Sequence, residues 1–386
     1  MKERVLYVVS SFGTGGICRA LQNTFNCLDT NKYDFDVFAI IPEGVYRGEL
    51  KNCKVLGSNY LLSAICPNYY TLHGFKKLIG YVGKVLNRLS GGHLISFAMK
   101  YVVNRLLKRG NYQAVIAYSE GLPTKFVSEA LHPNKIAWIH CDYQKYLEIV
   151  KKNEYHIYKR FEKVVCVSDY TRRSFVNVYP DLASNTHYIY NVLDSSFIKE
   201  MSEQMQTPQY ERNTINVVSV GRVDPVKRFS EIPRIVSEMK NANKIKWYIV
   251  GPAVGNQEEY KLLLANIEEY GVQTQVIPLG EKSNPYPYIA NADILVCVSL
   301  SEACPYVVNE AKVLGVPIVS TNFGSALEFI EDRKDGIITP LEMMPNVLDE
   351  LIADHKMYDG IKKNLSVFEY NNVKIMSEIY SLISEN

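Results

Sequence analysis

The sequence lacks several features that would each define a class of protein. No apolar run reaches the roughly 18 to 20 residues that span a bilayer, so we expect no integral membrane segment. We expect no secretory leader, because the first apolar run fits a buried strand that leads into a glycine loop. None of the eight cysteines is spaced as CxxC, and several stand in apolar runs, as expected of buried thiols in a reducing compartment. These absences predict a cytoplasmic protein.

A strong overall charge is also missing. The 386 residues include 43 basic and 41 acidic side chains, a net charge of +2 that implies no global field. Hydrophobic residues make up 47% and charged residues 22%, as in ordinary soluble proteins. Because the length exceeds that of one ordinary core, we expect two domains.

Acidic residues are absent from one long segment, residues 50–119, which holds ten lysines and arginines. Within it, large apolar residues recur at helical spacing from Phe75 to Leu89, and cations take the opposite arc. Such a cationic amphipathic helix can lie on an anionic membrane surface, through residues 75–109. It can equally pack its apolar arc on a sheet and leave a basic face in water. We expect no nucleic-acid binding, because no recognisable module accompanies the charge.

Short apolar runs alternate with longer amphipathic runs along most of the chain. Continuously apolar strands separated by helices predict parallel sheets covered on both faces. A polar stretch at residues 199–213 interrupts the pattern, and we interpret it as a linker. The sequence therefore predicts an α/β protein with two doubly wound domains, residues 1–195 and 196–365, and a last helix within 366–386. The expected strands are residues 4–9, 35–41, 114–118, 136–139, 164–167, 188–190, 217–221, 247–251, 275–279, 294–298 and 317–320.

Three loops at the expected carboxyl ends of strands carry candidate ligand-binding residues, because open α/β sheets bind ligands there. The first is Gly13-Thr14-Gly15-Gly16, after the first strand and before a helix. Glycines let the backbone approach a phosphate and a helix N-terminus attracts one, although a plain turn uses the same residues. Cys18 breaks the GxGxxG spacing, and no acidic partner for a ribose follows the second strand. Both observations argue against a nicotinamide dinucleotide.

The second loop follows the strand that ends near Gly221 and contains two cations, Arg222 and Lys227. An arginine can bind two oxygens of a diphosphate at once, and a lysine adds a point charge. A solvated basic loop is the alternative explanation.

The third loop, within residues 299–311, is the most specific. It brings Glu302 beyond a buried strand, Pro305 suits the first turn of a helix, and Glu310 falls about two turns into that helix. Two carboxylates there can accept hydrogen bonds from the hydroxyls of a sugar and a ribose. A helix N-terminus with favourable acidic residues is the alternative explanation.

Taken together, these loops resemble the signature of the family-four retaining glycosyltransferases. The resemblance covers nearly the whole chain in the right order. The motifs that carry it are Glu302 and Glu310 separated by seven residues, the run GVPIV at 315–319, Gly221-Arg222 with Lys227, Gly15-Gly16, and Ile139-His140 with Asp142.

The resemblance implies a GT-B fold, in which the first domain binds the acceptor, the second binds most of the donor, and the last helix returns to the first domain. It implies catalytic roles for Arg222, Lys227, Glu302 and His140. The family usually has glycine after the first glutamate. Here Ala303 stands in that place, and we expect its Cβ to narrow the sugar pocket. The implied donor-binding residues are Gly15, Gly16, Gly221, Arg222, Lys227, Gly280, Glu281, Glu302, Ala303, Cys304, Pro305, Tyr306 and Glu310.

On this basis we expect a retaining, metal-independent glycosyltransferase that needs no cofactor. It would move a sugar from a nucleoside-diphosphate sugar, with UDP favoured, to a saccharide or lipid-linked saccharide in cell-surface polysaccharide synthesis. It would act in the cytoplasm or peripherally at the inner face of the membrane. The run Asp34-Phe35-Asp36 matches the metal-binding DxD of another glycosyltransferase fold, but it opens an apolar run and predicts the start of a strand.

Three other functions stay open at this stage. A nucleotide-sugar epimerase can share this architecture, and a non-catalytic nucleotide-sugar-binding protein can retain the same residues. A dinucleotide-dependent oxidoreductase fits the glycine spacing less well.

Overall fold

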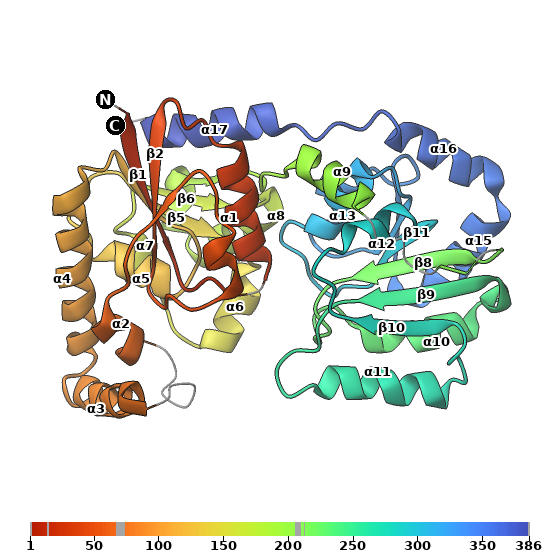
Figure 1. Cartoon of the computed structure of the whole chain (residues 1–386), viewed down its shortest axis with the longest axis horizontal. Coiled ribbons are helices and arrows are strands. Elements are labelled where there is room, and N and C mark those ends of the chain that lie inside the picture. The colour runs from red at the N-terminus through yellow and green to blue at the C-terminus, as the bar shows by residue number, and fades with distance from the viewer. Residues whose placement is uncertain (1, 14, 67–73, 205–209, 212, 385–386) are drawn as a thin grey trace. The chain divides into compact units, whose positions relative to one another are not determined.

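The computed structural model describes residues 2–13, 15–66, 74–204, 210–211 and 213–384. The chain divides into two compact units, Met1–Val192 with Asn372–Asn386, and Leu193–Asn371. Each unit contains one parallel sheet with helices on it, which confirms the expected α/β class with two doubly wound sheets (Figure 1). Part of the expected linker, residues 205–209 and 212, lies outside the described residues.

The sheet of the first unit has seven strands in the order β3-β2-β1-β4-β5-β6-β7. The short strand β3 (Lys54–Val55) was not expected, because two residues leave no hydrophobic pattern. The other strands are β1 (Glu3–Val9), β2 (Tyr33–Ala39), β4 (Ala114–Ala117), β5 (Lys135–Ile139), β6 (Lys163–Cys166) and β7 (Thr186–Tyr188). The helices are α1 (Gly16–Cys27), α2 (Tyr60–Ile65), α3 (Gly74–Leu89), α4 (His93–Gly110), α5 (Leu122–Ser128), α6 (Tyr143–Val150), α7 (Tyr155–Tyr158), α8 (Asp169–Val178) and α17 (Asn372–Ser384).

Both faces of the first sheet are covered, which explains its continuously apolar strands. Tyr7 of β1 packs against Phe25 of α1, with ring centroids 5.0 Å apart. Its neighbours Leu6 and Val8 belong instead to a core that includes Met99 of α4. Alternate side chains of one strand therefore enter different cores, as the period of two along a strand requires.

The last helix, α17, belongs to the first unit although it follows the second in the chain. The ring of Tyr380 stacks on Tyr33 at the start of β2, with centroids 5.4 Å apart. The Tyr33 hydroxyl lies 2.9 Å from Ser384 Oγ, and Asn134 donates a hydrogen bond to the Ile383 carbonyl. The carboxyl-terminal helix thus packs against the same unit as β1 and β2.

The Asp34-Phe35-Asp36 run lies in β2, as its apolar context predicts. The Asp36 carboxylate is buried, forms an ion pair with Arg4, and accepts a hydrogen bond from the Tyr112 hydroxyl at 2.6 Å. It is therefore used inside the fold. Among the described residues, no group of three or more His, Cys, Asp or Glu side chains is placed to hold a metal ion.

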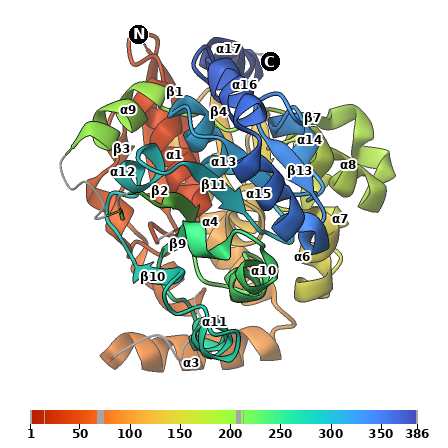
Figure 2. The ribbon, with the colours of Figure 1, turned by 90° about the vertical axis from the view of Figure 1, so that its right-hand side faces the viewer.

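The sheet of the second unit has six strands in the order β10-β9-β8-β11-β12-β13. Figure 2 shows α10 beside β10 in this unit. The strands are β8 (Ile215–Val220), β9 (Ile245–Val250), β10 (Val276–Gly280), β11 (Ile294–Cys297), β12 (Ile318–Thr321) and β13 (Ile337–Thr339), of which only β13 was not expected. The helices are α9 (Ser195–Glu203), α10 (Ile232–Glu238), α11 (Glu258–Glu269), α12 (Tyr286–Ala290), α13 (Tyr306–Val313), α14 (Ala326–Phe329), α15 (Met344–Ala353) and α16 (His355–Leu365).

Helix α3 confirms the helix expected over residues 75–89, but its orientation is unusual. Its buried residues are Gly80 and Gly83, whereas Phe75 and Leu89 are 71% and 79% exposed. The interpretation that its apolar arc packs on the sheet is therefore wrong. Within the described part of the chain, no helix is long and apolar enough to cross a membrane. All eight cysteines are free thiols.

Candidate active site

The centre of the second sheet contains a topological switch point. Strands β8 and β11 are neighbours, but the chain leaves β8 toward β9 on one side and leaves β11 toward β12 on the other. Loops that diverge in this way leave a crevice at the carboxyl ends of the strands, where open α/β sheets bind ligands. The second and third candidate loops of the sequence both lie at this point.

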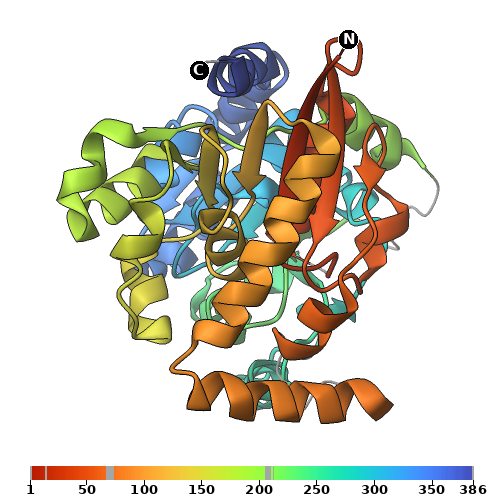
Figure 3. The same cartoon turned by 90° about the vertical axis from the view of Figure 1, so that its left-hand side faces the viewer.

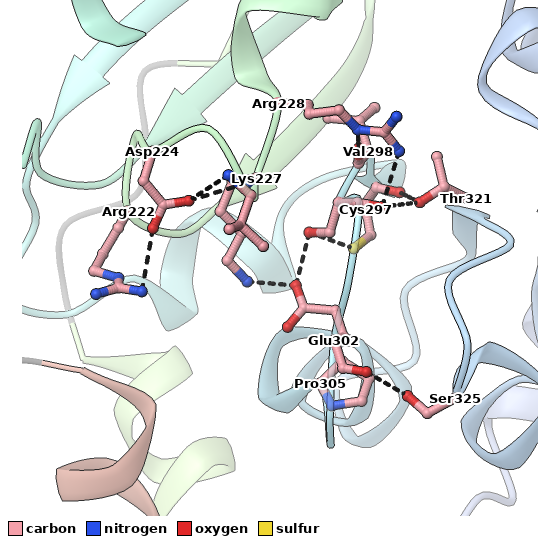
Figure 4. A network of polar contacts seen from close by, with 12 residues as sticks. Arg222, Asp224, Lys227, Arg228, Cys297, Val298, Glu302, Pro305, Thr321 and Ser325 are labelled. Atoms are coloured by element: carbon pink, nitrogen blue, oxygen red, sulfur yellow. Dashed lines mark hydrogen bonds and ion pairs between the residues drawn. The ribbon is translucent and has the colours of Figure 1, made fainter. Parts of the chain in front are cut away.

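The loop after β8 positions two cations through one carboxylate. Gly221 begins the loop with φ at 157°, a backbone conformation that glycine permits. Asp224 Oδ1 accepts the backbone N–H groups of Val226 and Lys227, both at 3.0 Å. Its Oδ2 lies 3.1 Å from the Arg222 guanidinium (Figure 4). Asp224 therefore shapes the turn and orients Arg222, a role that the sequence analysis did not assign.

The side chains of Lys227 and Glu302 meet at the switch point, although 75 residues separate them. Lys227 Nζ forms an ion pair with Glu302 Oε1, and Ser299 Oγ donates to the same oxygen at 2.7 Å (Figure 4). Burial lowers the pKa of Lys227, but Glu302, Cys297 and Asp224 together outweigh burial, so the pKa is raised. The second unit thus holds a permanent ammonium group beside a carboxylate.

Arg228 joins the two loops from the other side of the switch point. Its guanidinium donates to the Val298 and Ser299 carbonyls, both at 3.1 Å, just after β11 (Figure 4). Its backbone is left-handed, with φ at 52°, an uncommon conformation for a residue other than glycine. The Ser325 hydroxyl donates to the Glu302 carbonyl at 2.9 Å. These bonds fix the Glu302 loop against the end of the sheet.

Helix α13 begins directly after this loop and buries the second glutamate. Pro305 is its N-cap, one residue before the first helical residue, Tyr306. Cys304 is buried in the loop. Glu310, the fifth residue of the helix, is 1% exposed and accepts a hydrogen bond from the Tyr286 hydroxyl at 3.4 Å. A buried carboxylate at a switch point suits recognition of ligand hydroxyls, because those hydroxyls can replace lost water.

Glycines at the ends of β9 and β10 bring neighbouring loops into close contact. A Cβ on Gly251 would lie 1.7 Å from the Gly221 carbonyl oxygen, so only glycine fits there. Gly251 in turn donates its N–H to the Gly280 carbonyl at 2.9 Å. Glu281 follows Gly280 and is exposed. The Pro252 carbonyl accepts a hydrogen bond from the Val223 N–H.

The first unit holds the remaining candidates. Gly15 is the N-cap of α1, and a Cβ on Gly15 or Gly16 would meet no atom within 4 Å, so this loop is open; Thr14 lies outside the described residues. His140 follows β5, and its backbone N–H donates to Glu120 Oε2 at 3.1 Å. Burial lowers the pKa of His140 to about 3, so the imidazole is neutral at pH 7.

The half-buried Glu120 is a further residue that the sequence did not single out. It follows β4, and burial raises its pKa. Within the second unit, the structure brings Gly221, Arg222, Lys227 and Glu302 together at one switch point. Gly15, Gly16 and His140 belong to the first unit. Asp224 was detectable in principle, because it stands between two cations in one loop.

Comparison with known proteins accounts for both units. Residues 201–365 match the model described as "Glycosyl transferases group 1", and residues 15–197 match the model described as "Glycosyltransferase Family 4". A solved structure of Anabaena HepE in complex with UDP and glucose has a TM-score of 0.73 and 18% identity, over 99% of each chain. A Rickettsia africae glycosyltransferase has a TM-score of 0.75 and 15% identity, over 100% of this chain and 99% of that one.

Together these matches confirm the GT-B fold. The chain belongs to the glycosyltransferases of the family-four type. Two curated relatives extend the comparison. One is the N-acetylgalactosamine-N,N'-diacetylbacillosaminyl-diphospho-undecaprenol 4-alpha-N-acetylgalactosaminyltransferase of Campylobacter jejuni, 22% identical over 92% of this chain and 88% of that protein. The other is an uncharacterized 41.2 kDa protein in the cps region of Klebsiella pneumoniae, 25% identical over 48% of this chain and only half of the relative's length.

Proposed function

We propose that this glycosyltransferase moves a sugar from a nucleoside-diphosphate sugar, UDP-linked by preference, to a saccharide or lipid-linked saccharide, with retention of the anomeric configuration. The observation that carries the proposal is the meeting of Lys227 and Glu302 at the β8–β11 switch point. A cation for the diphosphate lies there beside a carboxylate for sugar hydroxyls. In a nucleoside-diphosphate sugar the diphosphate and the sugar are likewise directly joined. The UDP complexes of the Anabaena neighbour support the choice of base.

In this proposal each group of the donor has its own partner. Arg222 and Lys227 bind the diphosphate, and the N–H groups at the start of α13 add positive potential beside it. Glu302 and the backbone from Ala303 to Tyr306 hold the transferred sugar. Glu310 accepts the ribose hydroxyls, and the base lies by Gly280 and Glu281.

The Lys227–Glu302 pair must loosen when the donor binds. Both described contacts of the carboxylate use Oε1, so Oε2 is the oxygen that we assign to a sugar hydroxyl. The diphosphate then replaces Glu302 as the main partner of Lys227. Because the ammonium is already positioned and charged, little reorganisation accompanies the chemical step.

The proposed reaction needs charge placement more than a protein nucleophile. The bond between the anomeric carbon and the phosphate oxygen breaks through an oxocarbenium-like state, and negative charge grows on the leaving diphosphate. Arg222 and Lys227 stabilise that charge. The acceptor hydroxyl attacks from the same face and gives its proton to the leaving phosphate oxygen. His140, being neutral, can hydrogen bond to a sugar hydroxyl without adding charge.

The acceptor and the pathway are the broadest part of the proposal. The Campylobacter relative is named for a diphospho-undecaprenol substrate, and the Klebsiella relative for the cps region. These names support a lipid-linked saccharide in the synthesis of a cell-surface polysaccharide. We place the reaction at the cytoplasmic side of a membrane for the same reason.

Transfer assays with a panel of UDP-sugars and acceptors, followed by NMR of the product, test the proposal. We expect a new glycosidic bond with the anomeric configuration of the donor and undiminished transfer in EDTA. Inversion of configuration would reject the same-face mechanism. Donor isomerisation without an acceptor would indicate the epimerase instead, and tight donor binding with no turnover on any acceptor would indicate a non-catalytic binding protein.

A further inference from the structure

Helix α3 turns most of its large apolar side chains away from the unit to which it belongs, and only Ile79 among them packs against the core. Over 16 residues it exposes large apolar side chains at helical spacing, where an ordinary surface helix would bury them. The neighbouring helix α4 does the opposite and buries Met99, Val102 and Val103. The exposed fractions on α3 are 71% for Phe75, 57% for Leu78, 45% for Val82, 49% for Leu86 and 79% for Leu89.

Close packing on α2 fixes this orientation. A Cβ on Gly83 would lie 2.5 Å from Cγ2 of Ile65, the last residue of α2, so the backbone of α3 approaches α2 directly. No larger residue fits on this inner face without a shift. Lys76 Nζ also lies 3.2 Å from Glu43 Oε1 and 5.3 Å from the ring centre of Tyr60. The outward position of the leucines therefore follows from the packing on the opposite side of the helix.

Exposed cations lie on α3 and along α4. Lys77 and Arg88 are exposed on α3 itself. On α4, Lys100, Arg105, Lys108 and Arg109 are exposed as well. Residues 50–119 contain no aspartate or glutamate that would neutralise them. Figure 3 shows α3 crossing below the end of α4, away from the strands of the sheet.

We propose that the α3 surface, defined as Phe75, Leu78, Val82, Leu86 and Leu89 with Lys77 and Arg88, docks on an anionic lipid bilayer. Aliphatic side chains enter the boundary between headgroups and acyl chains, while the exposed cations meet anionic headgroups. A second copy of the chain fits less well, because a two-fold contact would oppose like charges. A nucleic acid would use the cations and leave the leucines in water.

The inference rests on the proposed function only for the biological reason for docking, since an enzyme with a lipid-linked acceptor must work at a membrane. Aliphatic and charged contacts make separate contributions that can be removed separately. Each cation near an anionic surface contributes roughly fivefold to the partition coefficient. The leucines contribute through burial, independently of the lipid charge.

Vesicle flotation of the full chain tests the α3 surface. The vesicles are phosphatidylcholine with and without phosphatidylglycerol, at low and high salt. The variants are Leu78→Ser/Leu86→Ser/Leu89→Ser, Lys77→Glu/Arg88→Glu, and a control, Leu262→Ser/Leu264→Ser. The control leucines on α11 are 48% and 42% exposed, so their replacement also removes exposed apolar surface, but elsewhere on the chain.

We expect the native chain and the control to float with phosphatidylglycerol vesicles at low salt and to be released by high salt. The charge variant should lose at least about 25-fold in partitioning, and the leucine variant at least about tenfold. Stabilisation by UDP, measured on the same variants, should be unchanged. Absence of UDP stabilisation in the native chain would reject the proposed donor site whatever the vesicles show.

Three results would overturn the α3 surface. The first is a native chain that does not float with anionic vesicles at low salt. The second is equal loss of flotation in the leucine variant and the α11 control. The third is a salt-sensitive complex with duplex DNA, or a dimer that the leucine variant dissolves, without lipid binding in either case.

Discussion

The loops after β1 and β8 occupy equivalent places in the two sheets, and both contain glycine. In each unit, a glycine that follows the next strand packs on the loop backbone. A Cβ on Gly44 would lie 2.0 Å from the Phe12 carbonyl oxygen, and a Cβ on Gly251 would lie 1.7 Å from that of Gly221. The two units thus share one device for bringing backbone close to a ligand.

The loops differ in charge. The loop after β8 contains Arg222 and Lys227, both oriented by Asp224, whereas the loop from Phe12 to Gly16 contains no charged residue. A glycine loop alone therefore does not define a diphosphate site. The uncharged loop of the first unit suits neutral hydroxyl groups better than a diphosphate.

Replacement of Lys227 should have the largest effect on activity, because it removes a charge that distinguishes the loop after β8 from the loop after β1. We expect Lys227→Ala to lower kcat by about 10²- to 10³-fold, because one preorganised charge opposite the leaving group is lost. Lys246→Ala is the matched control, since Lys246 forms an ion pair with Glu211 at 3.2 Å in the same unit but stands on strand β9, outside the loop after β8. Steady-state kinetics with saturating acceptor measure both. Equal kinetics in the two variants would remove Lys227 from the site.

The shared glycine device can be tested in both units at once. We expect Gly251→Ala to lower the free energy of unfolding by about 3 kcal/mol, because its methyl group must displace backbone atoms. Gly44→Ala should cost a similar amount. Thermal unfolding with and without UDP should show that only Gly251→Ala also weakens UDP binding. Equally weakened UDP binding in both variants would contradict the assignment of the donor to the second unit.

His140, the candidate histidine of the first unit, is uncharged in the folded chain, and this predicts a pH dependence of stability. The pKa of His140 is lowered to about 3 in the folded state, against about 6.5 when unfolded. Below pH 6.5 the unfolded chain binds a proton that the folded chain does not, so stability falls as the pH drops. We expect a loss of about 2 kcal/mol between pH 7 and pH 5. Denaturant titrations should show a flatter profile in His140→Gln, and identical profiles would contradict the enclosed imidazole.

Asp224→Asn should have the smallest effect of the four changes. The amide oxygen still accepts the backbone N–H groups of Val226 and Lys227, but the ion pair with Arg222 is lost. We expect roughly a tenfold fall in kcat/KM, with little change in stability. Asp224→Ala should lower kcat/KM further, because the turn also loses the acceptor of its two backbone N–H groups. Equal kcat/KM values in the two variants would show that these turn hydrogen bonds contribute nothing to activity.

Local patterns predicted most of the fold and only part of the candidate site. Continuous apolar runs located all the long strands, whereas β3 and β13, with two and three residues, left too little pattern. The spacing of Glu302 and Glu310 indicated a sugar site, but the pairing of Glu302 with Lys227 depends on the neighbourhood of β8 and β11. The orientation of α3 was also beyond reach, because Gly83 reveals its packing only beside Ile65.

Thermal unfolding in the presence of UDP, GDP, ADP and NAD tests the donor site of the second unit most directly. Glu310→Gln, which keeps the side-chain volume of a buried residue, accompanies Lys227→Ala and the native chain. At about 100 times its Kd, a bound nucleotide adds about 2.7 kcal/mol of stability. We expect one nucleoside diphosphate, UDP, to raise the melting temperature and both variants to lose most of that rise. Stabilisation by NAD alone, or by none of the four, would contradict a nucleoside-diphosphate site at the β8–β11 switch point.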